Sequence, residues 1–86
     1  MVEKAYRESV CSHVARILKQ EREKQGISMT RLAELAGLSQ GMISLIEHEL
    51  RNPSLDTLLR ICAPLDLELS AVLHRAERAA GKSTTK

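Results

Sequence analysis

Residues 26–47, which read GISMTRLAELAGLSQGMISLIE, contain the signals that decide the fold. Ser28 and Ser39 each stand just before a short apolar-periodic segment, where a hydroxyl accepts a hydrogen bond from an orphan backbone N–H of the first helical turn. Gly37 lies between the two segments and is suited to ending a helix, since glycine adopts left-handed dihedrals at little cost. A tight turn containing glycine between two helices is typical of a helix-turn-helix. The stretch therefore predicts two short helices, over roughly residues 29–36 and 40–48.

Each of these short helices is apolar on one face, so it needs partner helices to cover that face. Helical periodicity predicts a long first helix over residues 1–25. A fourth helix is expected to begin at Pro53 or Ser54 and to end before Pro64, whose ring nitrogen cannot donate a backbone hydrogen bond. A fifth helix is expected over roughly residues 69–79. The predicted fold class is all-α, a five-helix bundle.

The chain has 86 residues, which is room for one domain. We expect that domain to occupy residues 1–80, with the helix-turn-helix at about 28–48, and residues 81–86 to form a disordered tail. Tyr6 is the only aromatic residue, which excludes modules that stack bases on aromatic rings. A net charge of +2 predicts that any anionic partner is bound by a few placed cations rather than by bulk charge.

The composition also narrows the location and the chemistry. Cys11 and Cys62 are too few for a secreted disulfide scaffold, and no apolar run suits a signal peptide or a membrane span. The protein is therefore expected to be cytoplasmic, without membrane contact. His13, His48 and His74 are scattered without the spacing of a metal site or a catalytic triad. We expect no enzyme activity, no metal and no cofactor.

The second short helix presents a stripe of mixed residues on its outward face. Helical spacing places Gln40, Gly41, Ser44 and Leu45 opposite the apolar Ile43 and Ile46. A helix inserted in the major groove reads bases with its N-terminal and outward-facing residues. Any solvated helix also has a polar outward stripe, so the pattern alone does not decide between the two interpretations.

The sequence resembles the Cro/phage-repressor, or Xre, helix-turn-helix family over about residues 14–75. The resemblance rests on the spaced glycine, the two serine caps, the segment ISLIE at 43–47 and the loop RNPSL at 51–55. It implies a lambda-repressor-like five-helix fold. It also implies a small transcriptional regulator, found on the nucleoid when bound, whose recognition helix at about 39–48 enters the major groove of a pseudo-palindromic operator on double-stranded DNA.

The resemblance assigns a set of DNA contacts. Gln40 matches a base reader, and glutamine pairs bidentately with adenine. The expected contacts are Ser28, Met29, Thr30, Arg31, Ser39, Gln40, Gly41, Ser44, Leu45, Arg51 and Asn52. Three residues depart from the family pattern: Met29 replaces a phosphate-clamping glutamine, Leu45 replaces a polar reader, and Glu49 replaces a glycine near the expected phosphates.

The resemblance further implies a partly buried ion pair between Arg22 and Glu47, which joins the first helix to the recognition helix. Glu21 stands beside it where relatives carry leucine or alanine. A single helix in one groove is a small contact, so a homodimer on two half-sites is expected. The leucine-rich last segment is the proposed dimer contact, through Leu67, Leu69, Val72 and Leu73.

Two other functions remain open at this point. The low net charge, Met29, Leu45 and Glu49 also fit a protein-interaction module on the same fold, such as an antitoxin or an adaptor with a protein partner. A restriction–modification controller would share the DNA-binding chemistry and differ in the genes beside it. The residues do not specify the operator or the direction of regulation.

Overall fold

A computed structural model describes residues 3–84 of the chain. Over this range the backbone forms five helices, in the order expected from the sequence. They are α1 (Lys4–Lys24), α2 (Met29–Ala36), α3 (Gln40–Glu47), α4 (Leu55–Cys62) and α5 (Leu69–Thr84).

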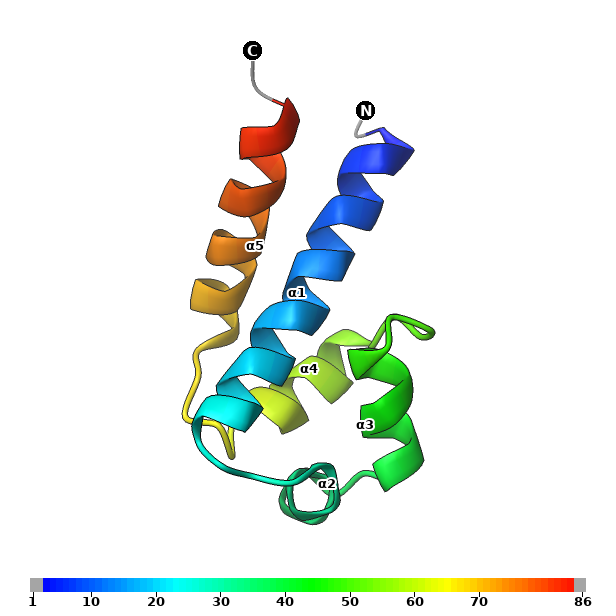
Figure 1. The fold of residues 1–86 in the computed structure, drawn as a ribbon, viewed down its shortest axis with the longest axis vertical. Helices are drawn as coiled ribbons and strands as arrows, with labels where there is room; N and C mark the ends of the chain where they lie inside the picture. Colours follow the sequence, from blue (N-terminus) through cyan, green and yellow to red (C-terminus); the bar gives the residue numbers. More distant parts are fainter. Residues whose placement is uncertain (1–2, 85–86) are drawn as a thin grey trace.

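The two long helices, α1 and α5, run side by side in opposite directions (Figure 1). They give the molecule an elongated shape of 41 × 21 × 19 Å. The short helices α2, α3 and α4 gather beside the C-terminal half of α1 (Figure 1). The start of α1 and the end of α5 therefore lie at the opposite end of the molecule from α2.

A serine side chain caps the N-terminus of each of the three short helices. Ser28 Oγ accepts a hydrogen bond from Arg31 N at 3.0 Å, and Ser39 Oγ accepts one from Met42 N at 3.1 Å. Ser54 caps α4 in the same way. These bonds satisfy backbone donors that have no partner inside the helix. The predicted caps at residues 28 and 39 are confirmed.

Each of the first four helices is followed by a residue in the left-handed backbone conformation. Gly26 and Gly37 occupy this position after α1 and α2, each with φ 71°. Glu49 after α3 and Asp66 after α4 adopt it without being glycine, with φ 62° and 57°. In each case the next backbone N–H bonds back to a carbonyl of the last turn, which satisfies an orphan acceptor.

The core is aliphatic and draws residues from all five helices. The side chains that are almost fully enclosed include Leu32, Ile43, Ile46, Ile61 and Leu65, each at most 2% exposed. Cys62 belongs to the same core, and burial raises the pKa of its thiol. The thiol therefore remains protonated and fills space as a small apolar group.

The structure corrects the expected end of the fold. Helix α5 runs to Thr84, so residues 81–84 of the expected tail are helical, while 85–86 lie outside the described residues. Ala76 and Ala80 are 0% exposed, and alanine is the best helix former, which favours continuing α5 alongside α1. Gly81 follows without a left-handed φ and therefore does not end the helix. Among the helices described, none is long and apolar enough to cross a membrane.

Candidate nucleic-acid interface

Helix α3 presents the predicted reading residues on the outside of the molecule. Gln40, Gly41 and Leu45 are exposed, and Ser44 is half-buried. Ile43 and Ile46 on the opposite face are buried against α1 and α2. The amphipathic pattern thus orients α3 so that its polar stripe is free to meet a partner.

Gln40 is held by the preceding helix. Thr30 Oγ1 of α2 donates a hydrogen bond to Gln40 Oε1 at 3.1 Å. The amide oxygen keeps a second lone pair and the amide nitrogen keeps its two hydrogens, so the group can still act as donor and acceptor toward a base. The sequence named both residues as contacts, but no spacing rule linked them, because they lie on different helices.

Gly41 is not required by the fold. A Cβ at this position would meet Ser39 Oγ at 3.9 Å, an ordinary contact. Glycine costs a helix up to about 1 kcal/mol relative to alanine. Its presence here leaves the backbone of the first turn of α3 open to close approach.

The start of α2 differs in part from the expectation. Met29 is half-buried and packs against the core, so its side chain contributes to the fold as well as to the expected contact surface. The reason is that its thioether chain gains more from apolar contact than from facing solvent. Arg31 is exposed and forms an ion pair with Glu34 at 3.2 Å. Thr30 remains exposed beside Gln40.

The loop between α3 and α4 presents Arg51 and Asn52, both exposed. Glu49, the acidic residue that precedes them in the loop, contacts two residues of α1. Glu49 Oε1 accepts a hydrogen bond from Ser12 Oγ at 2.7 Å, and Glu49 Oε2 lies 3.6 Å from Arg16 Nε. Helix α1 therefore holds this carboxylate and offsets its charge, which weakens its expected repulsion of a nearby phosphate.

Arg22 and Glu47 make the contact that the resemblance implied. Arg22 Nε donates to Glu47 Oε2 at 2.6 Å, and Arg22 Nη2 donates to Glu47 Oε1 at 3.0 Å. Arg22 Nη1 also donates to the carbonyl oxygen of Ile27 at 2.7 Å. The two side chains are only 10% and 5% exposed. The hydrogen bond to Glu47 outweighs burial and raises the pKa of Arg22, so the guanidinium stays charged.

Glu21, the departure beside this pair, has its own partner. Its carboxylate lies 3.6 Å from Arg75 Nη1 of α5 and is 17% exposed. The acid thus connects α1 to α5. Sequence spacing did not show this contact, because the two residues are far apart in the chain.

His48 belongs to the α3 surface, although the sequence interpretation left it as a scattered histidine. Its Nδ1 lies 2.8 Å from the Ser44 carbonyl oxygen and 3.3 Å from Ser44 Oγ. A carbonyl oxygen only accepts, so Nδ1 carries the hydrogen, and the ring is held one turn below Ser44. The spacing of four residues was the available signal. No group of three or more potential metal-ligating side chains occurs among the described residues.

The predicted dimer contact is corrected at one residue. Val72 is 1% exposed and belongs to the core of the single chain. Leu67, Leu69 and Leu73 are half-buried and pack against that core. The leucine-rich segment therefore closes the fold first, because a domain this small needs most of its apolar residues for its own core.

Comparisons with known proteins agree with this architecture. The helix-turn-helix family model matches residues 18–72. An uncharacterized helix-turn-helix transcriptional regulator of Haemophilus influenzae is 45% identical over 58 residues, which are 67% of this chain and 59% of that protein. This chain thus spans less than two thirds of that relative's length.

Solved structures extend the comparison. SinR, the master regulator for biofilm formation, in a crystal structure with DNA, superposes with a TM-score of 0.66 at 36% identity, over 70% of this chain and 97% of that one. ClgR, the clp gene regulator of Corynebacterium glutamicum, superposes with a TM-score of 0.77 at 23% identity, over 87% and 80% of the two chains. The second likeness shows the five-helix lambda-repressor-like fold alone. Together with the family match, these findings show that the chain belongs to the Xre/Cro-like helix-turn-helix family, which includes transcriptional regulators such as SinR.

Proposed function

We propose that this protein binds double-stranded DNA sequence-specifically and acts as a small transcriptional regulator at the nucleoid, with α3 in the major groove of a pseudo-palindromic operator. One observation carries the proposal: α3 is locked on its inner face and open on its outer face. The Arg22–Glu47 pair attaches its C-terminal end to α1, while Thr30 holds Gln40 at its N-terminal end. A fixed helix with an exposed donor–acceptor amide is suited to reading base edges.

The phosphate contacts follow from the ends of the neighbouring elements. The proposed set is the start of α2, with Ser28, Thr30 and Arg31, and the loop residues Arg51 and Asn52. Such contacts position a protein on the duplex and provide salt-dependent affinity. The likeness to SinR, which was crystallised with DNA, at 36% identity, supports DNA binding by this fold.

Fluorescence anisotropy tests the proposal. The protein is titrated against a duplex from its own promoter and against a scrambled duplex, each at two salt concentrations. We expect tighter binding to the promoter, lost in Gln40→Ala. Equal and steeply salt-dependent binding to both duplexes would retain DNA binding and leave the operator to selection from random sequence. An absence of binding to either duplex at low salt would overturn the proposal.

We also propose a homodimer, since two half-sites one helical turn apart need two copies of the domain. Leu67, Leu69 and Leu73 keep partial exposure and are the residues available from the predicted contact. Light scattering after gel filtration tests it, with a monomer at tens of micromolar as the contrary result.

A second function is favoured by a separate observation. Leu55 and Leu59 lie one turn apart on α4 and are 64% and 52% exposed. Two large exposed leucines on one helix face fit a protein-interaction module with a protein partner, such as an antitoxin or an adaptor. Salt separates the two functions, because phosphate binding weakens steeply with salt whereas a leucine contact does not. A restriction–modification controller remains a variant of the first function.

A further inference from the structure

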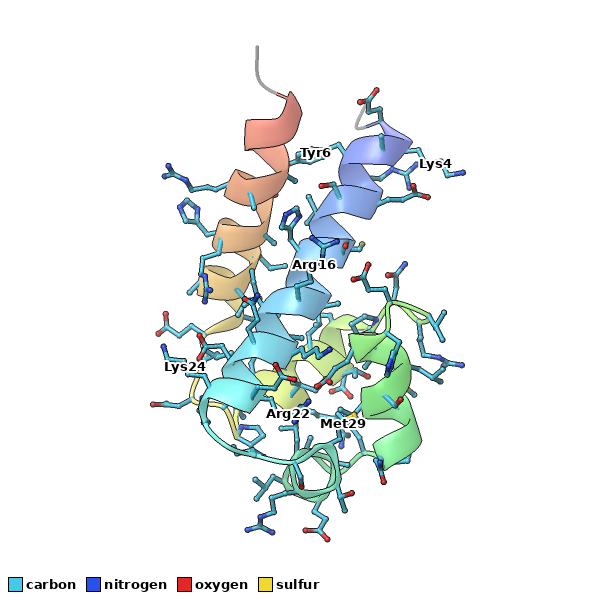
Figure 2. The ribbon with its side chains drawn as sticks, in the orientation of Figure 1. Lys4, Tyr6, Arg16, Arg22, Lys24 and Met29 are labelled. Carbon is cyan, nitrogen blue, oxygen red and sulfur yellow. The ribbon has the colours of Figure 1, made fainter. Side chains whose placement is uncertain are left out.

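A cleft of about 460 Å³ lies outside the helix-turn-helix, between the N-terminal half of α1 and the loop from α3 to α4. Lys4, Arg7 and Cys11 line it from α1, and Arg51 and Asn52 line it from the loop. Figure 2 shows Lys4 near the start of α1, directed to the side on which α3 and its following loop lie, away from α5.

The α1 wall of this cleft is a continuous helical stripe. The lining positions on α1 are 4, 7, 8, 11, 12 and 15, which is the spacing of one helix face. The family model matches from residue 18, so this stripe precedes the matched segment. The family's own contacts therefore do not account for it.

The charge of the lining favours an anion. Three cations, Lys4, Arg7 and Arg51, outnumber the two acids, Glu8 and Glu49. One of the acids, Glu49, is already hydrogen-bonded by Ser12 and lies beside Arg16, which adds a further cation next to the cleft. Lys4 and Arg7 line one wall of the cleft and Arg51 lines the other, so an extended anion could contact both walls at once.

We propose that this cleft is an additional binding site for the DNA backbone, which extends the contact of the α3–α4 loop along the same strand. The inference rests on the proposed function, because it assumes that Arg51 contacts a phosphate. A helix rises about 1.5 Å per residue, so Arg7 and Lys4 lie roughly 6 and 10 Å along α1 from Cys11, which borders the loop. Successive phosphates of one strand advance about 3.4 Å along the duplex axis. With α1 aligned along the strand, Arg7 and Lys4 would contact phosphates about two and three nucleotides beyond the one at Arg51.

The test is the salt dependence of DNA affinity in the double variant Lys4→Ala/Arg7→Ala. Each phosphate contact contributes about 0.9 to the slope of log K against log salt, so the slope is expected to fall by about 1.8 per bound protomer. The affinity for promoter and scrambled duplexes should fall by the same factor, because phosphates carry no sequence information. A second variant, Glu8→Gln, removes an acid from the lining and is expected to strengthen binding to both duplexes.

The matched control is Lys24→Ala/Arg78→Ala, which also removes one lysine and one arginine. Both residues are exposed, and neither lines the cleft. This control should keep the slope of the unmodified protein, and circular dichroism should show that both double variants remain folded. An unmodified protein that binds no DNA would defeat the proposed function itself. Normal DNA binding with an unchanged slope in Lys4→Ala/Arg7→Ala would overturn the cleft and leave the proposed function standing.

Discussion

The two faces of α3 differ in burial and in their contacts with the rest of the protein. On the inner face, Ile43 and Ile46 are 1% and 2% exposed, and the Glu47 side chain is 5% exposed in its pair with Arg22. On the outer face, Gln40 and Leu45 are exposed, and contacts there are few. The two faces of this eight-residue helix therefore have different roles. The inner residues fix the orientation of α3, and the outer residues are available to bind a partner.

The largest expected effect comes from removing the ion pair at the C-terminal end of the inner face of α3. Arg22→Ala leaves Glu47 buried without its partner, which should lower the free energy of unfolding by about 3–5 kcal/mol. Urea unfolding measures this value. The control is Arg31→Ala, which removes an exposed pair with Glu34 and should cost at most about 0.5 kcal/mol. A melting curve unchanged by Arg22→Ala would refute a structural role for the pair.

The next prediction compares the loss of stability at two adjacent residues on opposite faces of α3. Ile46→Ala removes a side chain that is 2% exposed and should destabilise the fold by about 2–5 kcal/mol, because it leaves a cavity. Leu45, at 36% exposed, should cost less than about 1 kcal/mol when changed to alanine, since little area is buried there. Thermal and urea unfolding of the two variants check this. Equal losses would mean that α3 does not have distinct faces.

On the outer face the effect moves from stability to binding. Gln40→Ala should weaken promoter affinity by about 1–3 kcal/mol, the value of a bidentate base contact. Its melting temperature should stay within a degree or two, because the amide is exposed. Anisotropy on promoter and scrambled duplexes checks the binding, and the loss should be confined to the promoter. An equal loss on both duplexes would assign Gln40 to phosphate contact instead.

The smallest effect has opposite signs in the two measurements. Gly41→Ala should stabilise the fold by up to about 1 kcal/mol, because alanine favours a helix and a Cβ here makes only an ordinary contact with Ser39 Oγ, at 3.9 Å. DNA affinity should fall modestly if the backbone approaches the duplex closely. Melting and anisotropy on one preparation test both signs. A stabilised variant with unchanged affinity would show that glycine has no binding role at this position.

Much of the fold could be predicted from local signals. The serine caps at 28 and 39 and the glycine at 37 set the bounds of α2 and α3 to within one residue. Caps and left-handed glycines act over a single turn, so they can be recognised in the sequence. The outward stripe of α3 could also be predicted from the sequence, since it follows from helical spacing alone.

The candidate site was only partly predictable, because several contacts join distant residues. Ser12 and Glu49 are 37 residues apart, and Thr30 and Gln40 lie on separate helices. The sequence predicts a dimer contact at Val72, which lies within the core, and a DNA contact at Met29, which also packs against the core. The sequence shows which residues are apolar, but not how much of that surface the chain needs for itself.

The sequence by itself determined the bounds of α2 and α3, the two faces of α3 and the family, because these depend on neighbours within a turn or on the order of motifs along the chain. The tertiary structure decided the left-handed turn at Glu49, the length of α5, the bond from Arg22 to the Ile27 carbonyl oxygen and the pairing of Glu21 with Arg75. A glutamate with φ 62° is unfavourable alone, and here Ser12 and Arg16 of α1 hold its carboxylate. Such a position is stable only once α1 is packed against the loop, so no local rule could identify it.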